Sequence, residues 1–438
     1  MIDSLPSLLM VVTILAGLLT GLPLAFVLGS IAVGFALVLW GPSSLYGLFS
    51  AGTSQLRNYV LIAVPLFILM AMILFRSGIA EDMYEAVHKW SGRLRGGLAM
   101  ATVVVCTLFA AVSGILSGSV VSMGLIALPN MFRHKYSKDI ALGSILGGAA
   151  LGPLIPPSVA AIIYGIMAGT SIGGLFAGGI ITGIIISFMF VVYIGVRSYI
   201  QKGLCPALPE EEIPSLAEKV RSLRHLVFPV LLILLVLGVI FTGVATPTEA
   251  SAVGVLGALI AAVVRRRLSF AMLKDCLTTC MSLTSMIIWI MIGATAFTSV
   301  FLGSGGMRMM EGFVALIPGG PMGTVIACML IVFVLGMFID TTAIIMITAA
   351  LFSPIVAALG IDKLWFGIIY MVNVLMGAFT PPFGFCIFIL KGVAPPDVTL
   401  TDIYKASLPF IGIQLFALVM FIAFPSAIMW FPRLLMAR

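Results

Sequence analysis

Long, almost uncharged apolar runs dominate this chain and restrict what it can fold into. A helix that spans a bilayer needs about 20 mostly apolar residues. Twelve candidate runs fall into two sets of six, separated by the charged stretch 198–225. The runs are 7–20, 24–40, 60–77, 98–133, 139–168, 172–197, 226–244, 249–264, 282–301, 322–358, 363–390 and 403–431.

The composition excludes most soluble classes of protein. Hydrophobic residues make up 61% of the 438 residues and charged residues only 9%, whereas a soluble domain carries about 25% charged residues. This excludes an ordinary water-soluble enzyme, a nucleic-acid binder and a disordered chain. A transmembrane β-barrel would show alternating segments of about 10 residues instead of long apolar runs. We therefore predict an all-α polytopic membrane protein that lies in a lipid bilayer and binds no nucleic acid.

The two halves of the chain carry matching glycine and proline positions. Five matches share an offset between 223 and 225 residues, which indicates an internal duplication. The matches are Pro23 with Pro247, Gly78 with Gly303, Gly97 with Gly320, Pro129 with Pro354, and Pro156-Pro157 with Pro381-Pro382.

The lysine and arginine positions predict the orientation, because cytoplasmic loops are enriched in both. With the N-terminus outside, 18 of the 23 basic residues are cytoplasmic, and only Arg57, Arg308, Lys363, Arg433 and Arg438 are outside. Run 98–133 is too long for one span and has basic loops at both ends. A re-entrant hairpin keeps both loops inside, and 322–358, also too long for one span, is interpreted as a hairpin that enters from the outside. Each half then crosses the membrane an odd number of times, so the repeat is inverted.

Each half contains two backbone breaks inside its apolar runs. The hairpin tips lie at 111–124 (AVSGILSGSVVSMG) and 335–346 (LGMFIDTTAIIM), and Pro-Pro breaks lie at 151–159 (LGPLIPPSV) and 377–385 (GAFTPPFGF). Carbonyls freed by proline cannot face lipid and need protein, water or an ion as a partner. A tip opposite a Pro-Pro break would form an oxygen cage for Na⁺. The helices that leave each break offer free N–H groups to an anionic substrate.

Two acidic residues have competing interpretations. Asp340 is the only acid in 322–358, and acids inside the membrane are functional by default, but Asp340 is also placed to cap the helix that follows. Glu249 lies three residues after Thr246, which favours a capping box over ligation. No protease, hydrolase or nucleotide-binding motif occurs. Without such motifs we expect no enzyme. The six cysteines form no CxxC pair, so we expect no disulfide and no metal bound by cysteine.

These residues resemble a known family. The motifs LGPLIPPS, TPPFGF, ATPTEASAVG, the SGILSGS tip and the Asp-Thr-Thr tip are similar to the large membrane (M) subunit of tripartite ATP-independent periplasmic (TRAP) transporters. The resemblance covers nearly the whole chain. It implies an elevator-type transporter of the bacterial inner membrane, with a scaffold, a moving transport domain and Na⁺ as the coupling ion. It also implies uptake of a small organic acid, such as a C4-dicarboxylate or a sialic-acid-like carboxylate.

The resemblance also implies partners and leaves alternatives. The partners are a periplasmic substrate-binding protein and a small four-helix TRAP membrane subunit. The first alternative is a self-sufficient sodium/organic-anion symporter that needs no binding protein. A membrane-embedded enzyme or a channel is a third reading, although the sequence offers no catalytic set and no continuous polar path.

The resemblance assigns site residues to the tips and breaks. A first Na⁺ site would use Ser113, Gly114, Ser117 and Ser119, opposite Gly152, Ile155 and Pro156. A second would use Gly336, Asp340 and Thr341 or Thr342, opposite Gly377, Thr380 and Pro381. The substrate would lie between the tips, near Ser119, Pro157, Asp340 and Pro382.

The expected organisation is two repeats joined by a cytoplasmic linker at 198–225. Repeat 1–197 contains scaffold helices within 1–80, hairpin 98–133, broken helix 139–168 and helix 172–197. Repeat 226–438 contains scaffold helices within 226–301, hairpin 322–358, broken helix 363–390 and helix 403–431.

Overall fold

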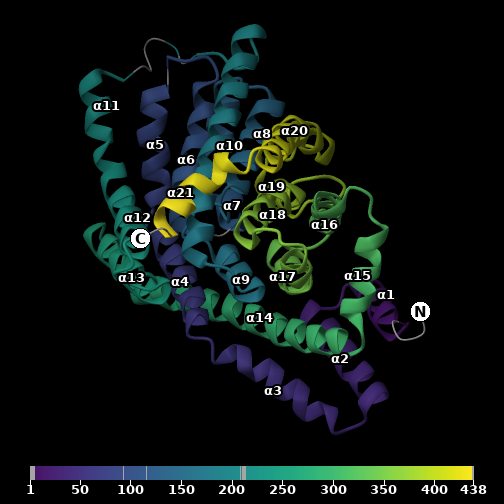
Figure 1. The fold of residues 1–438 in the computed structure, drawn as a ribbon. Coiled ribbons are helices and arrows are strands. Elements are labelled where there is room, and N and C mark those ends of the chain that lie inside the picture. Colours follow the sequence, from purple (N-terminus) through teal and green to yellow (C-terminus); the bar gives the residue numbers. More distant parts are fainter. Residues whose placement is uncertain (1–4, 92, 115, 208, 210–213, 437–438) are drawn as a thin grey trace.

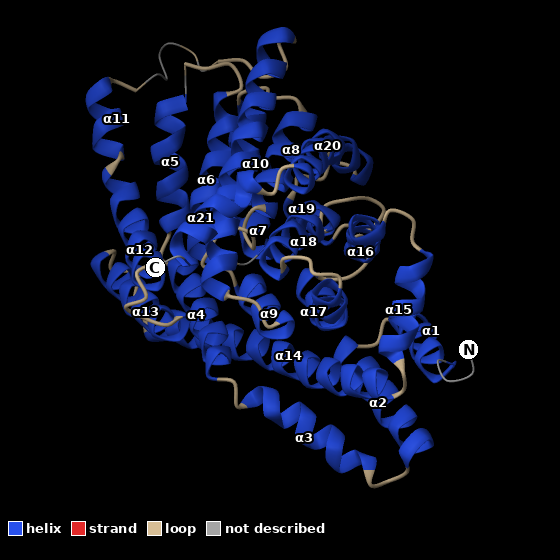
Figure 2. Cartoon of the chain, viewed as in Figure 1, coloured by secondary structure: helices blue, strands red, loops and turns tan. Residues whose placement is uncertain are grey.

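The computed structural model describes the chain except for residues 1–4, 92, 115, 208, 210–213 and 437–438. In this part of the chain all regular structure is helical and no strand occurs (Figure 2). Seven of its helices are long and apolar enough to cross a membrane, or eight if the bent pair α15 (Gly306–Leu316) and α16 (Gly320–Gly336) forms one span. The prediction of an all-α polytopic membrane protein is confirmed.

One group of helices surrounds α14, the longest helix among the described residues. It packs against α2, α3 and α4 (Figure 1), and α4 in turn packs against α13. The group consists of α1 (Leu5–Leu19), α2 (Leu24–Trp40), α3 (Ser44–Leu56), a 3-10 turn (Tyr59–Ile62), α4 (Ala63–Arg76), α12 (Arg224–Phe241), α13 (Pro247–Val264), α14 (Phe270–Gly303) and α15.

A second group contains the predicted hairpins and broken helices. Here α8 packs against α6, α7 and α20, and α18 packs against α16 and α20. Helix α9 contacts α17, and α19 contacts α7. The group consists of α6 (Gly97–Ser113), α7 (Leu116–Arg133), α8 (Lys138–Ala150), α9 (Val159–Ala168), α10 (Ile172–Ile200), α16, α17 (Thr341–Ala358), α18 (Lys363–Gly377), α19 (Phe385–Val393), α20 (Leu400–Ala423) and α21 (Ser426–Met436).

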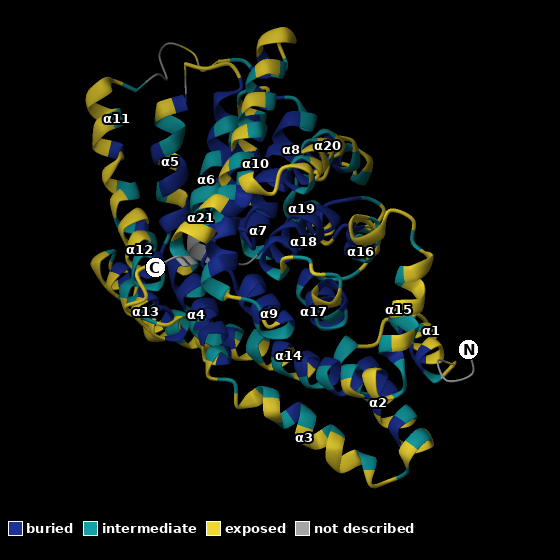
Figure 3. Ribbon diagram, in the orientation of Figure 1, coloured by how far each residue is buried: buried dark blue, intermediate teal, exposed yellow. Residues whose placement is uncertain are grey.

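Helices α8 and α18 form the interior of the second group. Every residue from Ile140 to Ala150 and from Leu364 to Gly377 is buried (Figure 3), as expected for helices that are apolar on all sides. Glycine allows this packing, because a Cβ added to Gly143 would lie 2.3 Å from the ring of Phe410 on α20. The two helices that lead into the Pro-Pro breaks are thus the most enclosed parts of the fold.

The elements follow the same order in the two halves. Residues 98–133 and 322–358 each form two helices that pack on one another, with a break at Gly114 in the first pair and at 337–340 in the second. Residues 139–168 and 363–390 are each split at their Pro-Pro segment, as α8–α9 and α18–α19. The inverted repeat and the re-entrant character of the two helix pairs stay predictions.

Four helices of the described residues lie outside the predicted runs, one of them α11 (Leu216–Ser222) in the linker, and one run is divided. Helices α3, α5 (Ile79–Ser91) and α15 are short and mix polar with apolar residues, so hydropathy did not reveal them. Residues 403–431 form α20 and α21 instead of one helix. The division falls at Phe424-Pro425, because proline disfavours helical geometry in the residue before it.

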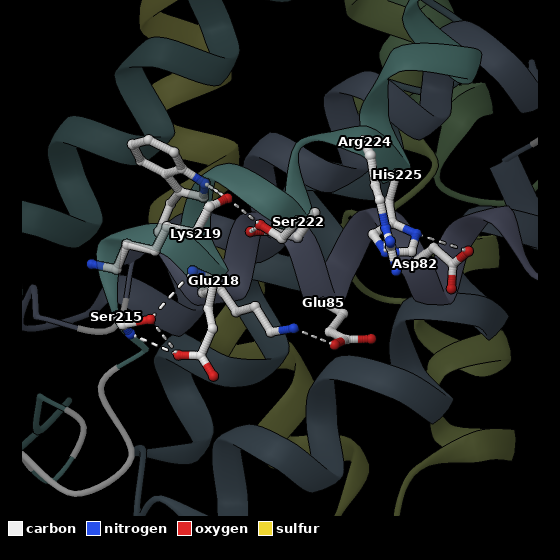
Figure 4. Close-up of polar contacts among 11 residues, drawn as sticks. Asp82, Glu85, Ser215, Glu218, Lys219, Ser222, Arg224 and His225 are labelled. Carbon is white, nitrogen blue, oxygen red and sulfur yellow. Dashed lines mark hydrogen bonds and ion pairs between the residues drawn. The ribbon is translucent and has the colours of Figure 1, made fainter.

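The stretch 198–225 contains a short helix, α11 (Leu216–Ser222), that lies against α5. Ser215 and Glu218 close a capping box at its start, and Figure 4 shows this pair together with the contact between Asp82 and His225. The indole Nε1 of Trp90 donates a 3.0 Å hydrogen bond to the carbonyl of Lys219. Polar contacts therefore hold this part of the linker against α5.

Candidate functional site

The first tip lies between α6 and α7 and touches the first Pro-Pro break. Gly114 has a φ of +56°, a conformation that favours glycine. A Cβ at this position would lie 2.7 Å from the carbonyl oxygen of Pro157, so any larger residue would separate the tip from the break. The side chain of Ser113 lies outside the described residues. Ser119 is fully buried one turn further along α7.

The first break, residues 151–158, is buried throughout and is fixed by its own polar groups. The Ser158 hydroxyl caps α9 by accepting a 3.1 Å hydrogen bond from the amide of Ala161, and it donates to the carbonyl of Pro153. The Pro156-Pro157 peptide bond is cis. The predicted positions Gly152, Ile155 and Pro156 all lie in this buried segment.

The second tip lies between α16 and α17 and carries the polar groups of the site. The carboxylate of Asp340 accepts a 2.9 Å hydrogen bond from the amide of Thr342 and so caps α17. The hydroxyl of Thr341 is buried and has no hydrogen-bond partner among the described residues. A buried hydroxyl without a partner is costly, so Thr341 is the best candidate here for a bound ligand or ion.

The second break touches this tip at two places. Gly377 packs on Gly336 so closely that its added Cβ would lie 2.7 Å from the Gly336 Cα. The amide of Gly384 donates a 2.9 Å hydrogen bond to the carbonyl of Met337. The Thr380 hydroxyl donates to the carbonyl of Met376, one turn back in its own chain, at 2.7 Å. A hydrogen bond to the preceding turn is the usual structural role of a single threonine in a membrane helix.

Pro381 and Pro382 follow in the same segment and are joined by a cis peptide bond, as in the first break. The carbonyl of Pro382 accepts a 2.6 Å hydrogen bond from the phenol of Tyr404 on α20. The second break is therefore anchored at both sides, by its tip and by α20.

A cavity of about 600 Å³ brings the two tips together. Gly114, Leu116 and Ser117 line it from the first tip, and residues 339–343 line it from the second. Pro153 of the first break lines it together with Val159 and Ala160 at the start of α9, and Phe385 at the start of α19 follows the second break. Helices α2, α4 and α14 close the remaining wall. The site is thus formed between the two helix groups.

Five helix N-termini reach this cavity, that of α2 and those of four helices at the tips and breaks. Helices α7, α9, α17 and α19 all begin at its wall, and the N-terminal end of a helix carries a partial positive charge with free N–H groups. Asp340 is the one charged side chain among the described residues that line it, and no lysine, arginine or histidine is among them. Among the described lining residues, backbone amides and the hydroxyls of Ser117, Thr341 and Thr342 are therefore the donors available to an anion.

Only part of the predicted site lines the cavity. Ser117, Gly114 and the second-tip residues Asp340, Thr341 and Thr342 do so. The predicted substrate contacts Ser119, Pro157 and Pro382 are not among the lining residues. The predicted positions Gly152, Ile155, Pro156, Gly336, Gly377, Thr380 and Pro381 are not among the lining residues either.

Sequence reasoning missed the wall formed by the first helix group. Two of the lining residues, Pro23 and Phe26, come from the start of α2. Only Pro23 could have been found from the sequence, since it is one of the matched repeat positions. Ile68 on α4 and the α14 residues Met286 and Trp289 gave none, since apolar residues in a membrane helix look alike whether they face lipid or a cavity.

Two further expectations concern residues outside the cavity. Thr246 and Glu249 form a capping box at the start of α13, in which the Glu249 carboxylate accepts a 2.7 Å hydrogen bond from the Thr246 amide. The capping interpretation of Glu249 is confirmed. Among the described residues, no group of three or more histidine, cysteine, aspartate or glutamate side chains could hold a metal ion.

Solved structures support the fold. The YdaH transporter of Alcanivorax borkumensis aligns with a TM-score of 0.65 at 14% identity, over 97% of this chain and 99% of that one. MtrF of Neisseria gonorrhoeae aligns with a TM-score of 0.60 at 12% identity, over 88% of this chain and 85% of that one. At these identities the likeness concerns the fold alone.

Sequence comparisons identify the family. The family described as "Tripartite ATP-independent periplasmic transporter, DctM component" matches residues 11–427. The C4-dicarboxylate TRAP transporter large permease protein DctM of Vibrio cholerae is 31% identical over 98% of both chains. The ectoine TRAP transporter large permease protein TeaC of Halomonas elongata is 32% identical, over 95% of this chain and 97% of that one. The sialic acid TRAP transporter large permease protein SiaM of Vibrio cholerae is 27% identical, over 95% and 96%. The chain therefore belongs to the DctM family of TRAP transporter large permeases, which are multi-pass proteins of the bacterial inner membrane.

Proposed function

We propose that this permease takes up a small organic acid across the inner membrane, driven by Na⁺ that moves with it. The main observation that supports this proposal is the cavity where the two tips meet, with four helix N-termini from the tips and breaks at its wall. Its relatives are permeases, and in this proposal the chain catalyses no reaction. A secondary transporter needs such a site at the junction of its repeats.

The second tip supports a Na⁺ site. Na⁺ prefers oxygen ligands, and this tip offers the Asp340 carboxylate, the unpartnered Thr341 hydroxyl and the Thr342 hydroxyl. The contact between Gly336 and Gly377 brings backbone from the break to the same place. In the first half, the corresponding ligands would come from the Gly114 and Ser117 tip and the residues 152–156 behind it.

The helix N-termini support an anionic substrate. Because no basic side chain is among the described residues that line the cavity, the carboxylate of the substrate would be bound by amides of α7, α9, α17 and α19 and by the nearby cation. The relatives are named for C4-dicarboxylates, ectoine and sialic acid, all of which carry a carboxylate. We propose the same class here, a small carboxylate such as a C4-dicarboxylate or a sialic-acid-like acid.

The family supports a three-part system. In this proposal a periplasmic substrate-binding protein delivers the acid, and a small four-helix membrane subunit accompanies the permease. The helices around α14 would form a static scaffold, and the group around α8 and α18 would move relative to it. The alternative is a self-sufficient sodium/organic-anion symporter.

Reconstitution tests the proposal. Vesicles that contain the permease and its small subunit are given a Na⁺ gradient and labelled succinate, ectoine or N-acetylneuraminate, with and without the cognate binding protein. We expect uptake that needs both Na⁺ and the binding protein. Uptake of the same size without the binding protein would support the symporter alternative. Uptake that is unchanged when choline replaces Na⁺ would refute the coupling.

A further inference from the structure

A second, smaller cavity lies beside the central one. Its volume is about 390 Å³, and it is formed by residues of the segment 56–65 and by Thr284, Ile287 and Ile288 on α14. Ile287 lines both cavities and is only 5% exposed. A single side chain therefore lies at the boundary between the two.

Arg57 brings a positive charge to this outer cavity. It is the one basic side chain among the described residues that line either cavity. It is exposed, and no ion pair joins it to another described residue. The backbone around it is held in place, because the side chain of Asn58 accepts a 3.1 Å hydrogen bond from the amide of Val60. The guanidinium is free to bind an anion.

The position of Arg57 in the chain suggests which side it faces. The distribution of basic residues places Arg57 outside the cytoplasm, at the end of α3 and before α4. Basic residues are normally kept on the cytoplasmic side, so a basic residue that lines an outer cavity departs from the pattern. A carboxylate arriving from the periplasm would meet the charge of Arg57 before it reaches the central cavity, where no basic side chain is among the described lining residues.

We infer that the cavity at Arg57 is an outer subsite, which captures the carboxylate of the substrate before it passes Ile287 into the central cavity. This inference rests on the proposed uptake of an organic acid. The interaction is a charge pair near the surface, so it is weak and screened by salt. A weak outer subsite speeds the transfer without trapping the substrate.

The first test compares transport by Arg57→Gln, Arg57→Lys and wild type in reconstituted vesicles, with labelled succinate, ectoine and N-acetylneuraminate. Arg57→Gln is expected to lower the apparent kcat/KM about two- to fivefold, the range of an exposed charge pair, with kcat retained at saturation. Arg57→Lys is expected to retain most of the rate. Arg308→Gln is the matched control, because Arg308 is also exposed, is also predicted to be outside and lines neither cavity.

The same variants separate capture of the substrate from docking of the binding protein. We expect the affinity of the membrane complex for the empty binding protein to be equal in wild type and Arg57→Gln. A loss of that affinity in Arg57→Gln would overturn the subsite and assign Arg57 to docking. Equal kcat/KM values for wild type and Arg57→Gln would overturn it as well.

A second test needs neither transport nor a binding protein, so it distinguishes failure of the subsite from failure of the proposed function. Tyr59 lines the outer cavity and is 58% exposed, and Tyr59→Cys places a thiol there. Succinate is expected to slow the reaction of this thiol with a neutral maleimide, whereas uncharged succinamide is not. Protection that persists in the Tyr59→Cys, Arg57→Gln double variant, or that succinamide gives equally, would overturn the inference.

Discussion

Gly336 at the end of α16 and Gly377 at the end of α18 lie backbone against backbone, with no room for a side chain on either. A Cβ on Gly377 would lie 2.7 Å from the Gly336 Cα, and one on Gly336 would lie 2.9 Å from the Gly377 Cα. The atoms that an added Cβ would meet belong to the backbone, so they cannot move aside by rotating a side chain. This contact holds the second tip against the second break.

Gly377→Ala is therefore expected to separate the tip from the break. Overpacking of this kind costs about 1–3 kcal/mol, and the displaced carbonyls would weaken Na⁺ activation of uptake. Thermal unfolding in detergent and the Na⁺ concentration for half-maximal uptake measure the two effects. Gly412→Ala on α20 is the control, since its added Cβ meets nothing within 4 Å. Equal unfolding temperatures for the two variants would contradict the prediction.

Asp340→Asn is expected to weaken Na⁺ activation while the protein stays folded. Asparagine keeps an oxygen that can accept the hydrogen bond from the Thr342 amide, so the cap of α17 survives, but the negative charge is lost. The Na⁺ concentration for half-maximal uptake should rise about tenfold or more, because a charge in a dry site interacts strongly with a cation.

Asp362→Asn provides the matched comparison for Asp340. Asp362 caps α18 in the same way, accepting a 2.8 Å hydrogen bond from the amide of Leu364, but it does not line the central cavity. The Asp362→Asn variant should therefore leave Na⁺ activation of uptake unchanged. If both variants changed Na⁺ activation equally, the effect would come from losing the charge of any capping carboxylate, and Asp340 would not be a Na⁺ ligand.

Thr341 offers a prediction in which stability and function change in opposite directions. Its buried hydroxyl has no hydrogen-bond partner among the described residues. Thr341→Val therefore removes a polar group whose loss of hydration on burial is not offset by a hydrogen bond. Stability should be equal or about 1 kcal/mol higher, while the Na⁺ concentration for half-maximal uptake rises. Thr341→Ser keeps the hydroxyl and should retain the Na⁺ response. A loss of stability in Thr341→Val would show that the hydroxyl has a structural partner.

The sequence predicted the breaks better than the walls around them. Proline and glycine interrupt helices for local reasons, so the breaks near Pro156, Pro381 and Gly114 could be placed from the sequence alone. The contact of Gly336 with Gly377 depends on how distant helices pack, and no local signal encodes it. Trp289 lines the cavity from a helix whose apolar residues give no sign of which face meets lipid.

The short helices show a second limit of the sequence. Helix α5 carries Asp82 and Lys89 among its apolar residues, so a hydropathy window treats it as a loop. It forms a helix because its apolar side packs on α6 and its polar side meets α11 and α12. Tertiary contacts of this kind decide the structure where local hydropathy is intermediate.

The native cysteines should be inert in the folded protein. All six are buried, and burial raises the pKa of the Cys205 thiol in the loop after α10. The reactive thiolate is therefore scarce near neutral pH. We expect no labelling by a membrane-permeant maleimide in intact membranes and labelling of all six cysteines after denaturation in detergent. Rapid labelling of the native protein would contradict this burial.

This inertness allows introduced cysteines to test the hairpin. Arg95 and Lys135 flank the α6–α7 pair and are both exposed. If the pair is re-entrant, Arg95→Cys and Lys135→Cys lie in the same compartment, because the chain dips into the bilayer and returns. A membrane-impermeant maleimide should label both in inverted inner-membrane vesicles and neither in intact spheroplasts. Labelling of the two positions from opposite sides would make α6–α7 a crossing, and the first tip would then no longer meet the second within the bilayer as an inverted repeat requires.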